Sequence, residues 1–164
     1  MPDIMSPPLV LGWREWAGLP ALGLPLLKAK LDTGARTSAL HAFDLDTETD
    51  ANDQLWVRFA VHPIQQQPEI VVQCRAPVID QRQVSDSGGH REQRYVITTP
   101  LHLGTSSWPI ELTLTNRDSM RFRMLIGRTA LAGRALVDSG LSYALGQPSH
   151  ASASYPSPTP SWSS

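Results

Sequence analysis

Apolar and polar residues alternate with a period of two along most of the chain. The clearest example is residues 110–115, where an isoleucine and two leucines alternate with polar side chains, the pattern of a strand with one buried face. Residues 55–61 and 70–75 show the same period, and the proline- and glutamine-rich residues 62–69 between them indicate a surface loop. These two strands are therefore expected to form a hairpin.

A second hairpin is predicted over residues 81–103. Its two arms flank the sequence Ser-Asp-Ser-Gly-Gly at residues 85–89. Adjacent glycines provide the positive φ angles that a tight hairpin tip requires. We expect this tip to be exposed and mobile.

Helical periodicity is almost absent. Only residues 128–133 combine good helix formers with a glycine, Gly133, that would end the helix. The pattern therefore predicts an all-β domain with one short helix near its C-terminal end.

The ends of the chain differ in composition from its middle. Of the 164 residues, 147–164 form a tail that is rich in serine and proline and has too little apolar content to pack. We expect this tail to be disordered, residues 1–8 to be flexible, and residues 9–146 to form one domain.

Composition and charge exclude several classes of partner. With 41% hydrophobic residues, 18% charged residues and a net charge of -1, the chain offers no basic surface for nucleic acid or an anionic membrane. Its apolar stretches are too short to cross a bilayer and its N-terminus has no secretory signal pattern, so a cytoplasmic location is expected. The single cysteine, Cys74, excludes an internal disulfide and a CxxC motif, and its strand setting predicts a buried thiol.

The strongest chemical signal is the sequence Asp-Thr-Gly-Ala at residues 32–35. It follows a strand-like segment that ends at Leu31, so the Asp32 carboxylate lies where the strand must turn. An Asp-Thr-Gly triplet alone is most often only a turn, because Asp and Gly favour turns for conformational reasons. A second segment changes this interpretation, since residues 122–131 carry an apolar run into a glycine and then into the predicted helix.

Together these segments resemble the retropepsins, the single-lobed aspartic peptidases that include the retroviral proteases. The shared motifs are the DTGA loop, the glycine tip at residues 88–89, which corresponds to the flap, and LIGR at residues 125–128. Residues 28–42, KAKLDTGARTSALHA, are similar to a bacterial branch that is often labelled "ATP-dependent zinc protease" and is found beside glutamate ligases. The resemblance covers most of residues 11–143 and implies a closed single-lobe barrel with a flap hairpin.

The resemblance also implies roles for individual residues. Asp32 would be the catalytic carboxylate, Gly34 would let the backbone approach substrate and water closely, and the Thr33 hydroxyl would lock the loop against its symmetry mate. Substrate binding is assigned to Ala35, Arg36, Ser87, Gly88 and Gly89, and support of the loop to Ile126, Gly127 and Arg128.

Peptide hydrolysis without a covalent intermediate requires two carboxylates. One activates water and the other, protonated, donates to the carbonyl oxygen, and a closely spaced pair shares one proton because both cannot ionise. Since the chain has one DTG loop, the resemblance implies a homodimer with its site on the two-fold axis. The triplet Asp138-Ser139-Gly140 is interpreted as a turn that closes the domain, because too little chain follows it to form a second lobe.

The site departs from the retroviral pattern in its charge. After DTGA the retroviral enzymes carry an acid that pairs with the arginine of the Gly-Arg segment, and this chain has Arg36 instead. Arg128 must therefore find another acid or a terminal carboxylate. Lys28 and Lys30 add positive charge, which favours the hypotheses of an anionic substrate, such as an oligoglutamate tail, and of an association with a glutamate ligase.

The sequence contains no pattern for a metal or a nucleotide. HExxH and GxxxxGK(S/T) are both absent, and the five histidines are isolated from one another. We therefore expect no zinc, no ATP and no other cofactor, despite the label that the bacterial branch carries.

Two functions remain as the main alternatives. The favoured one is a homodimeric aspartic endopeptidase that closes its hairpin over an extended peptide. The other is a non-catalytic module of the same fold that binds a peptide or a partner and works with a glutamate ligase. The intact triplet at residues 32–34 favours the enzyme, because a binding module has no chemical need for it, and a metallopeptidase is the least favoured option.

Overall fold

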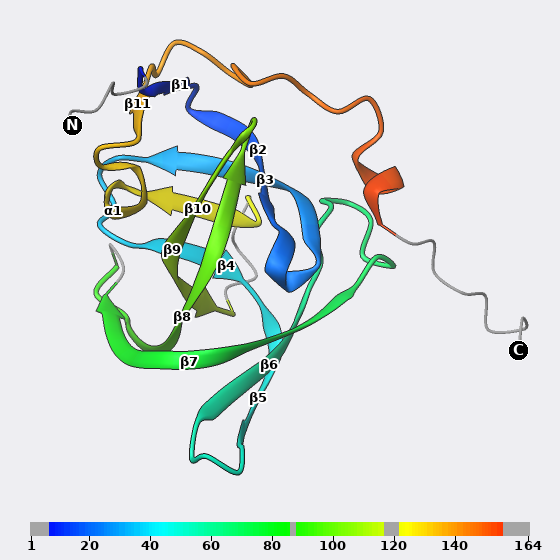
Figure 1. Cartoon of the computed structure of the whole chain (residues 1–164), viewed down its shortest axis with the longest axis vertical. Helices are drawn as coiled ribbons and strands as arrows, with labels where there is room; N and C mark the ends of the chain where they lie inside the picture. The colour runs from blue at the N-terminus through cyan, green and yellow to red at the C-terminus, as the bar shows by residue number, and fades with distance from the viewer. Residues whose placement is uncertain (1–6, 86–87, 117–121, 156–164) are drawn as a thin grey trace, which may run out of the picture.

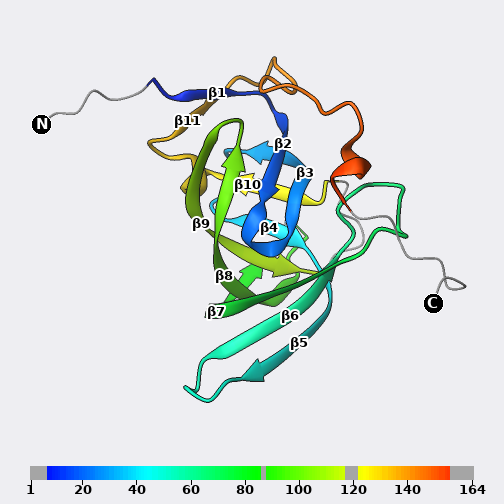
Figure 2. The same cartoon turned by 45° about the vertical axis from the view of Figure 1, so that its right-hand side comes forward.

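The protein is described by a computed structural model over residues 7–85, 88–116 and 122–155 (Figures 1 and 2). The strands are β1 Leu9–Leu11, β2 Arg14–Leu19, β3 Leu24–Asp32, β4 Ser38–His41, β5 Phe43–Thr49, β6 Leu55–Val61, β7 Val72–Ser85, β8 Arg91–Leu103, β9 Ser106–Thr115, β10 Met124–Gly127 and β11 Ala135–Val137. The helical segments are α1 Arg128–Leu131 and the single 3-10 turns η1 Pro20–Leu22 and η2 Ala151–Ser154. Within the described ranges no helix has the length and apolar character that crossing a membrane requires.

Six strands close into a barrel in the order β2-β3-β10-β4-β9-β8. The ring is completed where β8 returns to β2 and Gly18 pairs with His102. The pairs β3–β10 and β4–β9 are parallel, whereas the other pairs of the ring are antiparallel. Leucines that alternate along these strands, such as Leu27, Leu40 and Leu112, are fully buried inside. The predicted all-β barrel with one short helix near its C-terminal end is confirmed.

Both predicted hairpins are present and share one long strand. β7 pairs with β6 in its first half and with β8 in its second half. The sequence predicted separate segments at 70–75 and from 81, but β7 runs through 14 residues because the β6 ladder continues to Pro77 and the β8 ladder begins at Val78. The β5–β6 ribbon extends beyond the barrel and is seen below it in Figure 1.

The short helix begins at Arg128, as the sequence indicates, and ends at Leu131, two residues before Gly133. α1 follows β10 directly, and the chain turns out of it at Gly133, which has a φ of 76°. Such a positive φ is readily adopted by glycine, which has no Cβ. The helix therefore stays one turn long and remains next to the end of β10.

The C-terminal segment differs from the expectation. Residues 147–155, the described part of the predicted disordered tail, contact the domain through Tyr155, and residues 156–164 lie outside the described residues. Tyr155 is only 6% exposed, and its hydroxyl hydrogen-bonds to the backbone N and O of Leu26 in β3. The composition of this segment is dominated by serine, so it does not indicate that one aromatic side chain can pack and still hydrogen-bond.

The free cysteine is buried, as its strand setting predicted. Cys74 is 5% exposed, and burial raises the pKa of its thiol to about 12. A thiol of this kind is mostly protonated near neutral pH and behaves as a small apolar side chain.

Candidate active site

Asp32 stands at the end of β3, where the barrel strand turns into a surface loop. Its neighbour Leu31 is buried, whereas Asp32 is half-buried and Thr33 and Gly34 are exposed. The backbone N–H of Gly34 donates to Asp32 Oδ1 at 3.0 Å, and the N–H of Ala35 donates to the Asp32 carbonyl at 3.1 Å. Both bonds fix the loop, while within the described chain Oδ2 accepts no hydrogen bond and is available to another partner.

The end of β10 supports this loop from behind. Ile126 is fully buried and pairs with Leu31, and Gly127 pairs with Asp32 in the parallel ladder. The N–H of Gly127 donates to the buried Ser38 hydroxyl at 3.0 Å. A Cβ at Gly127 would lie 2.6 Å from the Thr37 carbonyl oxygen, so only glycine allows this close approach.

The first residues of α1 hold the other end of the loop. The N–H of Arg128 donates to the Ala35 carbonyl at 2.8 Å. The hydroxyl and the N–H of Thr129 both donate to the Arg36 carbonyl, at 2.7 and 3.2 Å. Of the three predicted supporting residues, Gly127 and Arg128 therefore contact the DTGA loop and Ile126 pairs with Leu31 just before it, whereas sequence reasoning missed the contribution of Thr129.

Arg128 has a different partner from the one expected. Its Nη1 donates to the Gly34 carbonyl oxygen at 3.2 Å, so it bonds to the loop backbone rather than to an acid. Arg36 is exposed, and none of the described carboxylates forms an ion pair with its guanidinium. The two arginines stay near the loop without an acid between them.

The predicted hairpin tip lies at the end of β7 and β8. Gly88 and Gly89 are exposed, and Gly89 has a φ of 84°, as expected of a tip glycine. Ser87, the third predicted tip residue, lies outside the described residues. The predicted roles of the tip and of the DTGA loop in binding and catalysis stay predictions.

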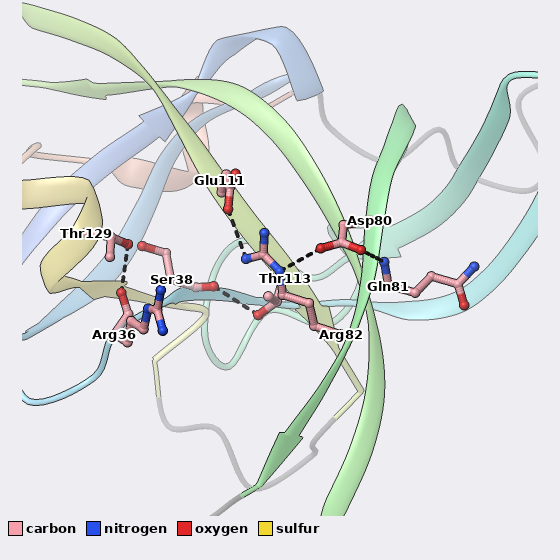
Figure 3. Close-up of polar contacts among 8 residues, drawn as sticks. All are labelled: Arg36, Ser38, Asp80, Gln81, Arg82, Glu111, Thr113 and Thr129. Atoms are coloured by element: carbon pink, nitrogen blue, oxygen red, sulfur yellow. Dashed lines mark hydrogen bonds and ion pairs between the residues drawn. The ribbon is translucent and has the colours of Figure 1, made fainter.

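A cleft of about 1000 Å³ lies between the hairpin, the barrel and the loop. Its lining includes Arg36 and Thr37 of the loop, Arg82 and Ser85 of β7, Glu111 of β9 and Thr129 of α1. Figure 3 shows Arg36, Arg82, Glu111 and Thr129. Asp32 itself does not line the cleft. The cleft therefore flanks the predicted catalytic loop and begins at Arg36, four residues after the carboxylate.

The lining of the cleft is basic. Among the described residues that line it are three arginines, Arg36, Arg82 and Arg134, and one carboxylate, Glu111. Ion pairs with Glu111 and Asp80 raise the pKa of Arg82 further above its usual range. No sequence motif marks Arg82, Arg134 or Glu111, so all three were missed.

The predicted lysines contribute little to this cleft. Neither Lys28 nor Lys30 lines it, and the Lys28 ammonium lies 5.6 Å from the ring centroid of Trp16. By contrast, the Arg134 guanidinium lies 5.5 Å from the Trp108 ring, and the Trp108 indole donates to the Ala130 carbonyl at 2.8 Å. The positive charge of the cleft therefore comes from arginines of three separate segments.

The second Asp-Ser-Gly triplet forms a turn, as predicted. The N–H of Gly140 donates to Asp138 Oδ1 at 2.9 Å, and the N–H of Leu141 donates to the Asp138 carbonyl at 3.1 Å. These bonds repeat the pattern at Asp32. The carbonyl of Leu141 accepts from Trp13, whose carbonyl in turn accepts from Leu31, so the turn closes the chain beside β3.

The buried Glu15 fastens this closing segment. Its carboxylate accepts hydrogen bonds from the N–H groups of Gly12, Ala144 and Leu145 at 2.6 to 3.1 Å.

Over the described ranges, no three His, Cys, Asp or Glu side chains gather as metal ligands would.

Comparison with protein families matches residues 10–148 to a RimB-like family, described as retropepsin-like aspartic endopeptidase RimB. This match covers the barrel, the DTGA loop, the hairpin and the α1 segment.

Two curated relatives are named probable alpha-L-glutamate ligase. The protein of Parasynechococcus marenigrum (strain WH8102) is 49% identical over 142 residues, which cover 87% of this chain and 30% of that protein. The protein of Shewanella pealeana is 45% identical over 138 residues, covering 84% of this chain and 30% of that protein. The chain thus spans less than a third of these relatives.

The fold matches a solved structure. The crystal structure of Lpg0085, a Legionella pneumophila protein with unknown function (DUF785), aligns with a TM-score of 0.70 and 25% sequence identity. The match covers 84% of this chain and 98% of the other.

Proposed function

Because the chain belongs to the RimB-like family of retropepsin-like aspartic endopeptidases, we propose that it hydrolyses peptide bonds with a pair of Asp32 carboxylates from two copies. The observation that carries this proposal is the DTGA loop at the end of β3. Its turn fixes Asp32 Oδ1 through Gly34, leaves Oδ2 without a bond in the described chain, and is supported by Gly127 and Arg128.

The chemistry follows from pairing two such carboxylates. At hydrogen-bonding distance they hold one proton between them, because two adjacent negative charges are unfavourable. The ionised Asp32 takes a proton from water as the water attacks the peptide carbonyl carbon. The protonated Asp32 donates to the carbonyl oxygen. The C–N bond then breaks as the carboxyl that took the proton from water gives it to the departing nitrogen, and a hydroxyl proton of the intermediate returns to the other Asp32.

Two features support the proposed homodimer. The chain carries one DTGA loop, so a single copy supplies one carboxylate of this kind. Exposed apolar side chains occur on the β1–β11 ribbon and on the turn after it, with Val10 48%, Leu136 60% and Leu141 40% exposed. Apolar surface of this kind is expected where a second copy packs.

An acidic peptide is the proposed substrate. The described residues that line the cleft beside the loop include three arginines and one carboxylate, and this excess of positive charge favours anionic side chains. The β7–β8 hairpin is long enough to hydrogen-bond to an extended peptide through its backbone. The names of the relatives suggest glutamate-rich products of a ligase as candidates.

A binding module is the second candidate function. It is favoured by one observation, that the relatives named probable alpha-L-glutamate ligase contain this domain within a longer chain. In this alternative the cleft would present an acidic peptide to a ligase without hydrolysing it.

The two functions are separated by incubating the protein with a peptide library that includes glutamate-rich sequences. Mass spectrometry should detect new termini with the wild-type chain and none with Asp32→Asn. Binding of acidic peptides without any new termini would favour the binding module.

A further inference from the structure

Arg82, on the β7 arm of the hairpin, forms ion pairs with two carboxylates of the same chain. Arg82 Nε contacts Asp80 Oδ2 at 2.8 Å, and Arg82 Nη1 contacts Glu111 Oε1 at 2.9 Å. Figure 3 shows the guanidinium between these two acids. Asp80 lies two residues earlier on the same strand, whereas Glu111 lies on β9, which is separated from β7 by β8.

The two acids have different relations to the cleft. Glu111 lines it together with Arg82, but Asp80 does not. Asp80, which does not line the cleft, binds Arg82 Nε, and Glu111, which lines it, binds the terminal nitrogen Nη1. That terminal nitrogen is the position that a carboxylate from a ligand in the cleft would approach.

The contact with Glu111 is exchangeable. The side chains of Arg82 and Glu111 are 36% and 51% exposed, so water competes with the pair. Exposed pairs of this kind contribute little to stability, because both ions remain partly hydrated. An incoming carboxylate can replace Glu111 without leaving a buried unpaired charge.

We propose that Glu111 is an internal competitor for Arg82, and that an acidic side chain of the substrate displaces it. Arg82 would then be a specificity-determining residue that selects a negative charge, and Glu111 would weaken the binding of every acidic ligand. This inference rests on the proposed acidic peptide and names the residue pair that selects it.

The exchange has a consequence for selectivity. A ligand with one carboxylate gains one ion pair and breaks another, so its net gain is small. A peptide with several carboxylates also meets Arg36 and Arg134, which are not paired with any described carboxylate. Glu111 therefore favours multiply acidic segments over singly acidic ones.

The test measures peptide binding rather than hydrolysis. A fluorescent hexapeptide containing glutamates and its glutamine counterpart are titrated by anisotropy into the Asp32→Asn chain at low salt. On this background Glu111→Gln should tighten the binding of the acidic peptide about two- to fivefold, because an exposed competing pair is removed. The binding of the glutamine peptide should be unchanged.

Arg82→Gln should weaken the binding of the acidic peptide about tenfold, because a charge-assisted hydrogen bond is lost. In the Arg82→Gln chain Glu111 is unpaired and repels the acidic peptide directly, so adding Glu111→Gln should tighten binding only by removing this repulsion, and the tightening should disappear at high salt. Glu48→Gln is the matched control, because Glu48 pairs with Arg75 at 3.1 Å and with similar exposure, and neither residue lines the cleft.

The results distinguish this inference from the proposed function. Equal tightening of both peptides by Glu111→Gln, or none of either, would overturn the inference, as would equal binding of the acidic and neutral peptides to the parent chain. Hydrolysis by the wild-type chain is measured separately, and its absence would contradict the peptidase while leaving the binding result to decide the role of Glu111.

Discussion

A single turn determines which part of Asp32 is available for chemistry. The Gly34 N–H holds Oδ1, and the loop behind it is fixed by the end of β10 and the start of α1. A carboxylate that is oriented by its own loop needs little rearrangement when it meets a second one. The residues that hold the loop are therefore expected to affect activity as well as stability.

Replacing Asp32 with asparagine should abolish hydrolysis with little change in folding. An amide oxygen can still accept the Gly34 hydrogen bond, but an amide cannot act as a base or share a proton. Peptide turnover should fall by about two orders of magnitude or more. Asp138→Asn is the matched control, because Asp138 forms the same turn with Gly140. Loss of turnover in the control instead would identify Asp138 as a catalytic carboxylate.

Gly127 is expected to be intolerant of a side chain. In Gly127→Ala the new Cβ would lie 2.6 Å from the Thr37 carbonyl, so the loop or β10 must move. We expect a loss of about 1–3 kcal/mol in unfolding free energy and a drop in turnover.

A second glycine provides the control for this change. Gly104→Ala meets only Leu145 side-chain atoms, at 3.5 Å or more, but it has a φ of 62° and should lose about 1 kcal/mol through backbone strain. It lies away from the cleft, so turnover should be unchanged. Turnover and urea unfolding are measured for both variants. Equal turnover in the two would contradict a role of Gly127 in supporting the loop.

At the level of whole elements, the C-terminal segment contributes more than its composition suggests. Tyr155 packs against the core cluster and bonds to the backbone of β3. Tyr155→Ala should lower the free energy of unfolding by about 2 kcal/mol or more, because a buried aromatic side chain is lost. The exposed Ser154→Ala should have no effect in the same urea denaturation. Equal stability of the two variants would show that this segment does not pack in solution.

The same tyrosine predicts a loss of stability at alkaline pH. Burial raises the pKa of Tyr155 to about 12, above its ordinary value of 10.0. Its contribution is therefore fully present below pH 10 and is lost as the pH rises from 10 to 12. Tyr155→Phe should reduce the slope of unfolding free energy against pH in this window, and an unchanged slope would contradict the assignment. Cys74, with a raised pKa of about 12, contributes in the same direction in both proteins.

Local patterns were sufficient to predict the elements that carry the DTGA loop, the hairpins and the short helix. Each depends on alternation, on turn residues or on a motif within a few positions. The cleft could not be predicted, because Arg82 and Glu111 are distant in sequence and meet only when β7, β8 and β9 become neighbours in the sheet. Exposed charges leave no periodic signal, and the burial of Tyr155 depends on β3, far away in the chain.

On the scale of the whole molecule, the barrel presents the DTGA loop at its surface. The strand order places this loop, α1 and the end of the β7–β8 hairpin around one cleft. One DTGA loop supplies one Asp32 carboxylate, whereas the proposed reaction needs two. We therefore expect the dimer to be active and the single chain to be inactive. The central claim is that each active site contains Asp32 from both copies.

Mixing wild-type and Asp32→Asn chains tests this claim most directly. After equilibration at a fixed total concentration, turnover per wild-type chain is measured as the share of mutant increases. If both carboxylates are required, heterodimers are inactive, and a mixture of one wild-type chain to three mutant chains should retain about a quarter of the activity per wild-type chain. Activity per wild-type chain that stays constant across the mixtures would contradict the shared site.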